Sequence, residues 1–268
     1  MCSVGEGMPT NMLPTALIMV PLILFSPEIS AGLVIGTSTA FLVWGLIRDR
    51  DYWRLAVLLA FPFWHCVQVA NWTISLLAIS VIPNAYPLLV LKPHAGLPVA
   101  VLRFHWQGIL IGSIPVLVSF ALIPDWPVRW WATARTYSGG PLILQTPWAI
   151  PFLIVILRWR FESARYLIMC LLAPLRAFYD YLLLFALPQT PNQLMILVIS
   201  SWIMYLSWYY WPEVGAPLYV LLGLYLPCLL WIVSGRLVSA TIGINSCAGD
   251  VFVQGWKLKN LISKRSNT

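Results

Sequence analysis

The residues that could do chemistry are few, and the first group is a lysine, a proline and a histidine in a row. Lys92, Pro93 and His94 stand in the middle of an apolar run, Tyr86–Leu102. A cation at membrane depth costs a few kcal/mol, and a proline removes a helix hydrogen bond. Such a lysine snorkels to the interface, pairs with a carboxylate, or faces a polar cavity that holds an anion. The functional interpretation is that Lys92, helped by His94, binds the phosphate of a lipid-linked or nucleotide-like ligand.

A second charged group follows later in the chain. Arg176 and Asp180 are four residues apart, which places them on one face of a helix, where they can neutralise each other inside a membrane. Asp180 could instead be the partner, or the base, that faces Lys92. The sequence leaves both alternatives open.

Amide side chains form the third group. Gln68 and Asn71 lie within the apolar run Leu55–Ile82, and Asn71-Trp72-Thr73 has the pattern of a glycosylation sequon. The apolar surroundings argue against that modification. Amides in a broken membrane segment bind sugar hydroxyls, neighbouring helices or free backbone groups. A packing role and a sugar-binding role are therefore both open for these two residues.

Other catalytic and metal-binding patterns are missing from the sequence. Its three histidines, nine carboxylates and five cysteines do not fall at the spacing of a metal site. There is no glycine-rich phosphate loop and no Gly-x-Ser-x-Gly elbow. We therefore expect no metal and no cofactor.

The composition indicates that the candidate groups lie in a membrane protein. Of the 268 residues, 60% are hydrophobic and 9% are charged, which is too few charged groups to solvate a globule of this size. The net charge of +7 would favour nucleic-acid binding in a soluble chain. Here most basic residues lie in short links between apolar runs, as cytoplasmic loops do. We expect membrane lipids as partners, and no nucleic acid.

The apolar runs predict an all-α, polytopic transmembrane bundle. Since about 20 residues cross the hydrocarbon region, the runs predict about eight crossings, some of them broken or re-entrant. We expect residues 1–235 to form a single transmembrane domain and residues 236–268 to form a basic C-terminal tail. The runs are Asn11–Phe25, Ala31–Ile47, Leu55–Ile82, Tyr86–Leu102, Gln107–Ile123, Pro141–Leu157, Tyr166–Leu187, Gln193–Trp211 and Ala216–Ser234.

Arginine-rich links and prolines divide this bundle. The links Arg48–Arg54 and Arg158–Arg165 each carry three arginines, so we expect them in the cytoplasm. Between Gln68 and Pro87 we expect an irregular segment, which membranes tolerate only where it is buried in protein or lines a watery cavity. The external link Pro124–Arg135 predicts a short amphipathic helix on the membrane surface.

The second half of the chain leaves the topology open. Three simple crossings after Arg165 would place the basic tail outside, against the positive-inside rule. The alternative is that Tyr166–Leu187 is broken into two half-helices at Pro174. The sequence does not decide between them.

Four stretches together resemble a known family. Leu91–His94, followed by an apolar helix and a basic link, resembles the Lys-Pro-Gln/His segment of the polyprenyl-phosphate-mannose-dependent mannosyltransferases, which are bacterial membrane glycosyltransferases of the C superfamily. Phe61–Trp72 resembles the family's proline-rich helix with its Gly-Gln/Asn signature. Pro124–Pro127 resembles a later external link, and Pro174–Tyr181 resembles a Pro-x-x-x-Tyr-Asp segment. The stretches occur in the family's order.

The resemblance implies a helical, multi-pass enzyme of the bacterial cytoplasmic membrane. Such an enzyme transfers a sugar from a polyprenyl-phosphate donor to a lipid or glycan acceptor on the outer side. It implies that Lys92 holds the donor phosphate, and that a carboxylate in the first external loop is the catalytic base. The candidate catalytic residues are Glu28, in that loop, and Asp125, in a later external link. The candidate substrate-binding residues are Lys92, His94, Asn71, Gln68, Arg176, Tyr179 and Asp180.

The sequence departs from the family in two ways that bear on activity. Family members have a longer N-terminal part with an acidic first loop, whereas here that link is a few residues long and holds only Glu28. The Gly-Gln/Asn signature appears as Ala70-Asn71. One alternative is therefore a reduced relative that has lost catalysis. The other is a non-enzymatic membrane protein, either a small subunit of a complex with partner subunits or a lipid carrier or transporter.

These hypotheses predict different structures. An active transferase needs Lys92 and either Glu28 or Asp125 to face a common cavity large enough for a lipid head group. A structural subunit needs Lys92 to be neutralised by Asp180, and a flat, exposed aromatic face.

Overall fold

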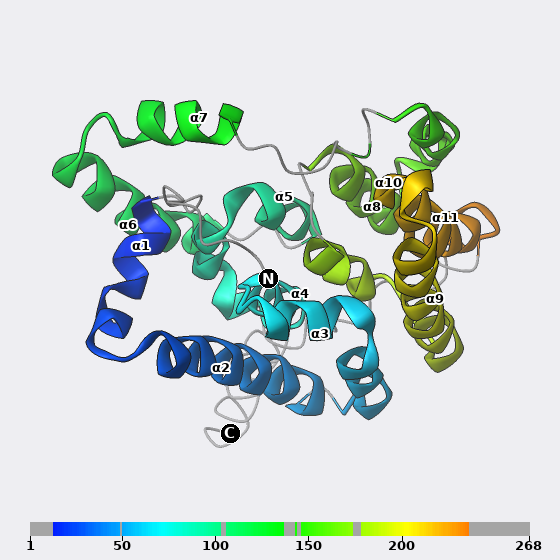
Figure 1. The fold of residues 1–268 in the computed structure, drawn as a ribbon, viewed down its shortest axis with the longest axis horizontal. Coiled ribbons are helices and arrows are strands. Elements are labelled where there is room, and N and C mark those ends of the chain that lie inside the picture. Colours follow the sequence, from blue (N-terminus) through cyan, green and yellow to red (C-terminus); the bar gives the residue numbers. More distant parts are fainter. Residues whose placement is uncertain are drawn as a thin grey trace, which may run out of the picture.

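The chain folds into helices, as its composition and periodicity predict. A computed structural model describes residues 13–48, 50–102, 106–136, 143, 146–173 and 178–235, and no strand occurs in these ranges. Figure 1 shows the short helix α4 (Thr73–Val81) inside the molecule, with α2 (Pro27–Arg48) along one edge and α7 (Trp126–Thr136) along the opposite edge. The tail expected at 236–268 lies outside the described residues.

The elements include α-helices, several 3-10 helices and one π-helix, η8. In chain order they are α1 (Leu13–Met19), η1 (Val20–Leu24), α2, η2 (Tyr52–Leu59), α3 (Phe61–Gln68), α4, η3 (Pro83–Leu91), α5 (Pro93–Leu102), α6 (Trp106–Leu122), α7, η5 (Pro147–Arg158), α8 (Glu162–Leu172), η6 (Phe178–Ala186), α9 (Pro191–Tyr210), η7 (Pro212–Val214), α10 (Ala216–Val220), η8 (Leu221–Tyr225) and α11 (Leu226–Val233).

The core forms around α4, which is buried on all sides. Residues 73–80 are all buried, and α4 packs against α2, η3, α5 and η6. Gly45 allows α2 to lie close to the end of α4, since a Cβ atom there would lie 2.7 Å from Cγ1 of Ile82, which directly follows α4. The hydroxyls of Ser38 and Ser75 share a hydrogen bond of 2.7 Å across the same contact. Small residues and interhelical hydrogen bonds are the usual means by which membrane helices pack.

Prolines divide the apolar runs into short helices. Proline lacks an amide hydrogen and its ring clashes with the preceding turn, so it is favoured at a helix start and destabilises a helix interior, where Pro98 of α5 and Pro115 of α6 nevertheless occur. Accordingly, α3, η3, η5 and α9 each have a proline in their first two positions. The run Leu55–Ile82 becomes η2, α3 and α4, and the run Tyr86–Leu102 is broken before Pro93.

Within the part of the chain that the structure describes, two helices are long and apolar enough to cross a membrane. They are α2 and the continuous helix Ala216–Val233, which comprises α10, η8 and α11. A third candidate exists if α6 and α7 count as one span, although they are bent by 94°. The structure makes a membrane-embedded protein plausible. The expected number of about eight crossings is not confirmed, because most apolar runs form helices shorter than the roughly 20 residues that a straight crossing needs.

Two local predictions in the first half of the chain agree in part with the structure. The irregular segment expected between Gln68 and Pro87 is present only in part. A turn separates α3 from α4 and a break separates α4 from η3, but the residues between these breaks form the regular helix α4. A helix is present where one was expected at Pro124–Arg135, namely α7, and its location on a membrane surface stays a prediction. It begins at Trp126, whose ring lies 5.6 Å from that of Phe120 in α6, so this contact packs across the bend.

The run Tyr166–Leu187 is broken. It forms α8, which ends at Leu172, and η6, which begins at Phe178, on either side of Pro174. The two pieces fold back on each other, because the Tyr166 hydroxyl donates a hydrogen bond of 2.7 Å to the carbonyl of Leu183. The structure therefore has the broken helix that one alternative requires, whereas the tail, which the other alternative concerns, lies outside the described residues.

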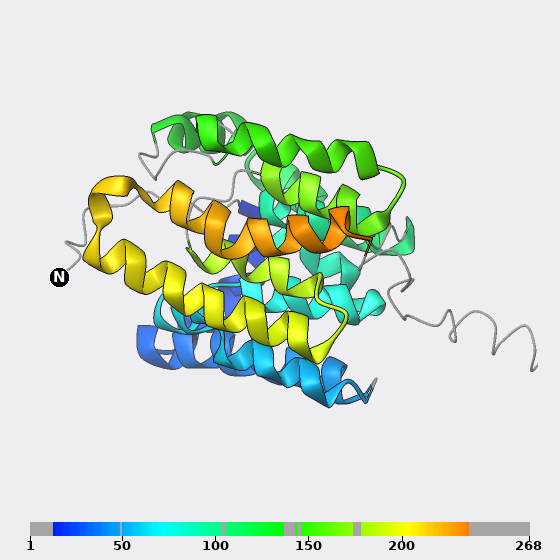
Figure 2. The same cartoon turned by 90° about the vertical axis from the view of Figure 1, so that its right-hand side faces the viewer.

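The C-terminal helices form a hairpin. Figure 2 shows α9 and the α10–α11 helix lying side by side. Gly223 permits their close approach, since a Cβ atom there would lie 2.8 Å from Cβ of Met204. The second half of α9 carries an exposed group of aromatic residues, which we call the α9 aromatic face. It comprises Trp202, Tyr209, Tyr210 and the adjoining Trp211.

Candidate polar site at Lys92

Lys92 lies at a break between two helices. It follows η3 and precedes Pro93, the first residue of α5, and its backbone is extended (φ −152°, ψ 71°). Proline disfavours the helical conformation in the residue before it, which explains why the helix stops there. The Lys92 side chain is directed into the protein, with 13% of its surface exposed. The apolar pattern alone would place this lysine in the middle of a helix, whereas in the structure it lies between two helices.

The partner of Lys92 is Asp180. The ammonium forms an ion pair with Oδ1 of Asp180, which belongs to the first turn of η6 and has only 5% of its side chain exposed. The Lys92 ammonium also lies over the ring of Tyr179, 4.6 Å from its centroid. A buried cation is therefore compensated by a carboxylate and by the negative face of an aromatic ring.

Asn71 and Thr73 complete this polar cluster from the α3–α4 turn. The turn closes with a hydrogen bond of 3.0 Å from the main-chain N–H of Asn71 to the main-chain carbonyl of Cys66. Within the turn, Ala70 adopts a positive φ of 49°. Oδ1 of Asn71 accepts hydrogen bonds from the amide and hydroxyl of Thr73, at 3.1 and 2.8 Å. Asn71 thereby forms an Asx turn just before α4, which fixes the direction of its side chain.

The two residues also contact the ion pair. The Lys92 ammonium donates to Oδ1 of Asn71 at 3.4 Å and to the Thr73 hydroxyl at 3.5 Å. The Thr73 hydroxyl lies 3.3 Å from Oδ1 of Asp180. We refer to Asn71, Thr73, Lys92, Tyr179 and Asp180 as the polar cluster. It joins the end of η3, the start of α4 and the start of η6.

A row of aromatic rings leads from the polar cluster to Tyr205 of α9. The Tyr179 ring is stacked on His65 at 5.5 Å, and His65 is stacked on Phe61 at 5.7 Å. Phe61 is stacked in turn on Tyr205 of α9 at 4.0 Å. Gln68, three residues after His65 on α3, is exposed. Aromatic rings thus cover one side of the polar cluster. Its residue Asn71 comes three positions after the exposed Gln68, the last residue of α3.

The candidate catalytic carboxylates lie elsewhere. Glu28 is exposed in the first turn of α2. Asp125 precedes α7 and forms an ion pair of 2.7 Å with Arg129, one helical turn later. Neither carboxylate contacts the polar cluster. Among the described residues, the carboxylate that does contact Lys92 is Asp180.

The structure brings together four of the seven candidate substrate-binding residues. Asn71, Lys92, Tyr179 and Asp180 share the cluster, and Gln68 lies nearby on α3. His94 is in the first turn of α5, and its side chain is not described. Arg176 lies outside the described residues.

Sequence reasoning did not select Thr73 and His65. Thr73 had a signal, because an asparagine two residues before a hydroxyl residue is compatible with an Asx turn as well as with a sequon. His65 had none, since a single histidine in an apolar run does not reveal which rings will lie on its two faces.

The cluster has the chemistry of an anion site with its own counter-ion. An ammonium has three donors, and an amide and a hydroxyl beside it can contact further oxygens. No group of three or more metal-ligating side chains occurs among the described residues.

Comparison of the sequence with family models and curated proteins, and of the structure with solved structures, finds no match.

Proposed function

We propose that this chain is a membrane protein that binds the phosphate of a polyprenyl-phosphate-linked sugar at Lys92. The observation that carries the proposal is the convergence of Asn71, Lys92, Tyr179 and Asp180. These residues suggest a donor site from sequence, and they come from separate segments, with Lys92 and Asp180 being 88 residues apart. Ionisable groups held inside a membrane protein mark ligand sites by default, because burial makes them costly.

Asp180 would act as the counter-ion of the unliganded site. A phosphate that approaches Lys92 meets an ammonium already paired with the Asp180 carboxylate. The phosphate and the carboxylate would then both lie beside the ammonium and would repel each other. Binding therefore requires Asp180 to turn away or to share the ammonium. Asn71 and Thr73 already contact the ammonium and would keep it in position during this exchange.

The proposal covers donor binding and leaves out the transfer step. A transferase needs a base beside the acceptor hydroxyl, within hydrogen-bond reach of the proton it removes. Glu28 and Asp125 are exposed and contact none of the cluster residues. The protein we propose is therefore a reduced glycosyltransferase-like protein that keeps the donor site.

The test is binding of polyprenyl-phosphate-mannose to the full chain in detergent, measured by native mass spectrometry and thermal shift. The matching polyprenol without phosphate serves as the ligand control. We expect Asp180→Asn to bind the phosphate lipid several-fold more tightly, because it removes the repelling charge. We expect Lys92→Met/Asp180→Leu, which removes both charges together, to bind roughly tenfold more weakly or not at all. Equal binding of the polyprenol and its phosphate by the wild type would reject the site.

A second candidate is a non-enzymatic subunit of a membrane complex. It is favoured by the ion pair itself, since Asp180 neutralises Lys92 within the chain, and by the exposed α9 aromatic face. In that case the pair ties η3 to η6 and no lipid phosphate stabilises the wild type. The double variant Lys92→Met/Asp180→Leu would then retain full stability, and the complex would be detected by co-purification with partner subunits.

A further inference from the structure

A long-range hydrogen bond joins α1, the first described helix, to the break beside Lys92. The hydroxyl of Thr15 in α1 donates to the main-chain carbonyl of Leu91 at 2.7 Å, and the two residues are 76 positions apart. Thr15 is 1% exposed and Leu91 is 4% exposed, so water does not compete for this bond. The helix α1 packs against η3, which ends at Leu91, and against α6. The bond therefore ties two separate segments together inside the protein.

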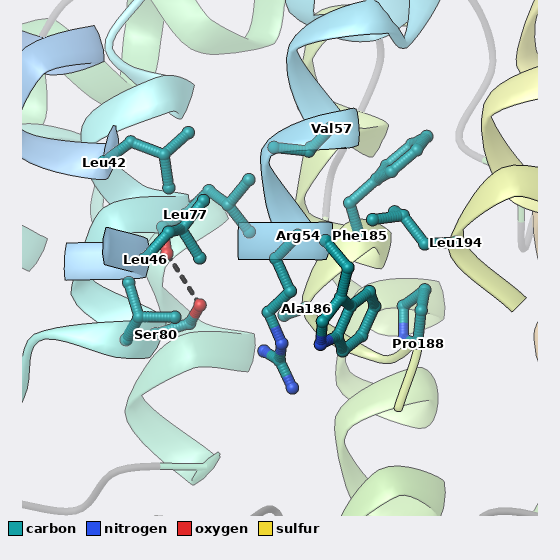
Figure 3. A pocket seen from close by; sticks show the side chains of 12 residues that line it. Leu42, Leu46, Arg54, Val57, Leu77, Ser80, Phe185, Ala186, Pro188 and Leu194 are labelled. Carbon is teal, nitrogen blue, oxygen red and sulfur yellow. Dashed lines mark hydrogen bonds between the residues drawn. The ribbon is translucent and has the colours of Figure 1, made fainter. Parts of the chain in front are cut away.

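The hydroxyl of Ser80 shows the more local kind of bond. Ser80 lines a small groove between α2, α4 and η6, and its hydroxyl donates a hydrogen bond of 2.6 Å to the carbonyl of Leu77, in the preceding turn of the same helix (Figure 3). A serine or threonine in a helix can form such a bond without tertiary contacts, because the carbonyls three and four residues earlier lie beside its hydroxyl. The bond from Thr15 is different, since it exists only where α1 packs on η3.

The carbonyl that Thr15 contacts belongs to the peptide group that carries Lys92. A peptide group is planar, so the Leu91 carbonyl, the Lys92 N–H and the Lys92 Cα lie in one plane. The N–H of this group donates to the carbonyl of Leu89 at 3.3 Å. Thr15 thus holds the carbonyl end and Leu89 holds the N–H end. These two bonds fix the orientation of the peptide from which the Lys92 side chain starts.

The break in the helix explains why the carbonyl of Leu91 takes a donor from another segment. Pro93 has no N–H, and Lys92 has an extended backbone, so the helical hydrogen-bond pattern is interrupted at this point. A buried carbonyl at such a break needs a donor from elsewhere in the fold. The Thr15 hydroxyl supplies one.

We propose that Thr15 is a positioning residue for Lys92. By holding the peptide between Leu91 and Lys92, it directs the lysine side chain toward Asp180 and Tyr179, which the ammonium contacts in the polar cluster. Thr15 acts through the main chain and does not itself bind the phosphate. Its effect on the ion pair is independent of any ligand, whereas its effect on lipid binding rests on the proposed function.

The first experiment measures the rate at which acetic anhydride acetylates Lys92 in the full chain in detergent, by peptide mass spectrometry. Burial and the contacts with Asp180 and Tyr179 shield the Lys92 amine from the reagent. Thr15→Val replaces the hydroxyl with a methyl group of similar size, and should speed acetylation of Lys92 several-fold. Thr15→Ser keeps the hydroxyl and should restore the wild-type rate. Thr15→Ala makes the same test if the valine variant does not fold.

Tyr225→Phe is the matched control for a general loss of stability. It removes another buried hydroxyl that donates to a distant main-chain carbonyl, that of Cys170, at 2.9 Å. We expect it to lower the melting temperature about as much as Thr15→Val does, and to leave the acetylation of Lys92 at the wild-type rate. An unchanged rate in Thr15→Val, an equal increase in Tyr225→Phe, or no rescue by Thr15→Ser would each overturn the positioning role.

The second experiment measures binding of polyprenyl-phosphate-mannose to the same variants by native mass spectrometry. We expect Thr15→Val to bind the lipid several-fold more weakly than the wild type, and Thr15→Ser and Tyr225→Phe to bind it equally well. If the wild type does not bind the lipid, the proposed function fails, and the acetylation rates still decide whether Thr15 positions Lys92. If the wild type and Thr15→Val bind the lipid equally well, the positioning role is overturned and the proposed function stands.

Discussion

Two ion pairs of the same chemistry occupy opposite environments in this protein. Lys92 and Asp180 have 13% and 5% of their side chains exposed, whereas Arg129 and Asp125 have 73% and 54% exposed. The first pair joins two segments that are far apart in sequence, and the second joins neighbours on one helix. In an exposed pair, water and salt replace either partner when the other is lost. In a buried pair, losing one partner leaves a charge that no solvent compensates.

The largest effect should come from breaking the buried pair. Asp180→Ala removes the carboxylate that compensates Lys92, so we expect a loss of about 3–5 kcal/mol in the free energy of unfolding. Reversible unfolding in mixed detergent micelles measures it. Asp125→Ala is the matched control from the exposed pair. Similar losses in the two variants would mean that the environments do not differ as the exposures indicate.

The support of the buried pair should have the next largest effect. Asn71→Leu removes the oxygen that accepts from Thr73 and Lys92, which leaves buried donors without this acceptor. We expect a loss of about 1–3 kcal/mol, measured by the same unfolding experiment. Gln68→Leu, on the exposed end of α3, is the control and should change stability by less than about 0.5 kcal/mol. A loss in Gln68→Leu as large as that in Asn71→Leu would show that the cluster does not depend on Asn71 in particular.

A substitution beside Asn71 should stabilise the protein. Ala70 has a positive φ of 49°, a conformation that costs a residue with a Cβ atom about 1–2 kcal/mol. Ala70→Gly removes this strain and increases the freedom of the unfolded chain, so we expect a net gain of up to about 1 kcal/mol. The melting temperature in detergent should rise, whereas it should fall for Ala78→Gly within α4. A lower melting temperature for Ala70→Gly would contradict the strained turn.

The smallest effect should come from the exposed pair. Arg129→Ala should cost less than about 1 kcal/mol, because exposed i,i+4 pairs contribute little. Any cost should shrink as salt is raised from low to physiological ionic strength, since the Debye length falls. Unfolding at two salt concentrations measures this. A cost that is large and independent of salt would show that Arg129 has a packing role on α7.

Much of the local structure could be predicted from the sequence. Composition indicated helices and a membrane setting, and proline positions indicated the break between α8 and η6. The Pro-Asp-Trp-Pro turn with its arginines and tryptophans indicated α7. These features depend on residues that are near one another in the chain, so the pattern contains the information that determines them. The number of crossings was harder to predict, because apolar composition does not tell a spanning helix from a short helix packed in the core.

What the sequence by itself determined is that Lys92, in an apolar run, needs a compensating partner. It offered two arrangements for Asp180, as the partner of Arg176 on one helix face or as the partner of Lys92. The contact of η3 with α4, and of α4 with η6, brings Asp180 and Thr73 to the ammonium. Arg176 lies outside the described residues, so the structure bears on the second arrangement alone. Only the tertiary structure shows that Asp180 reaches Lys92, because a buried charge is stabilised by whichever group packing brings within a few ångströms, whatever its distance along the chain.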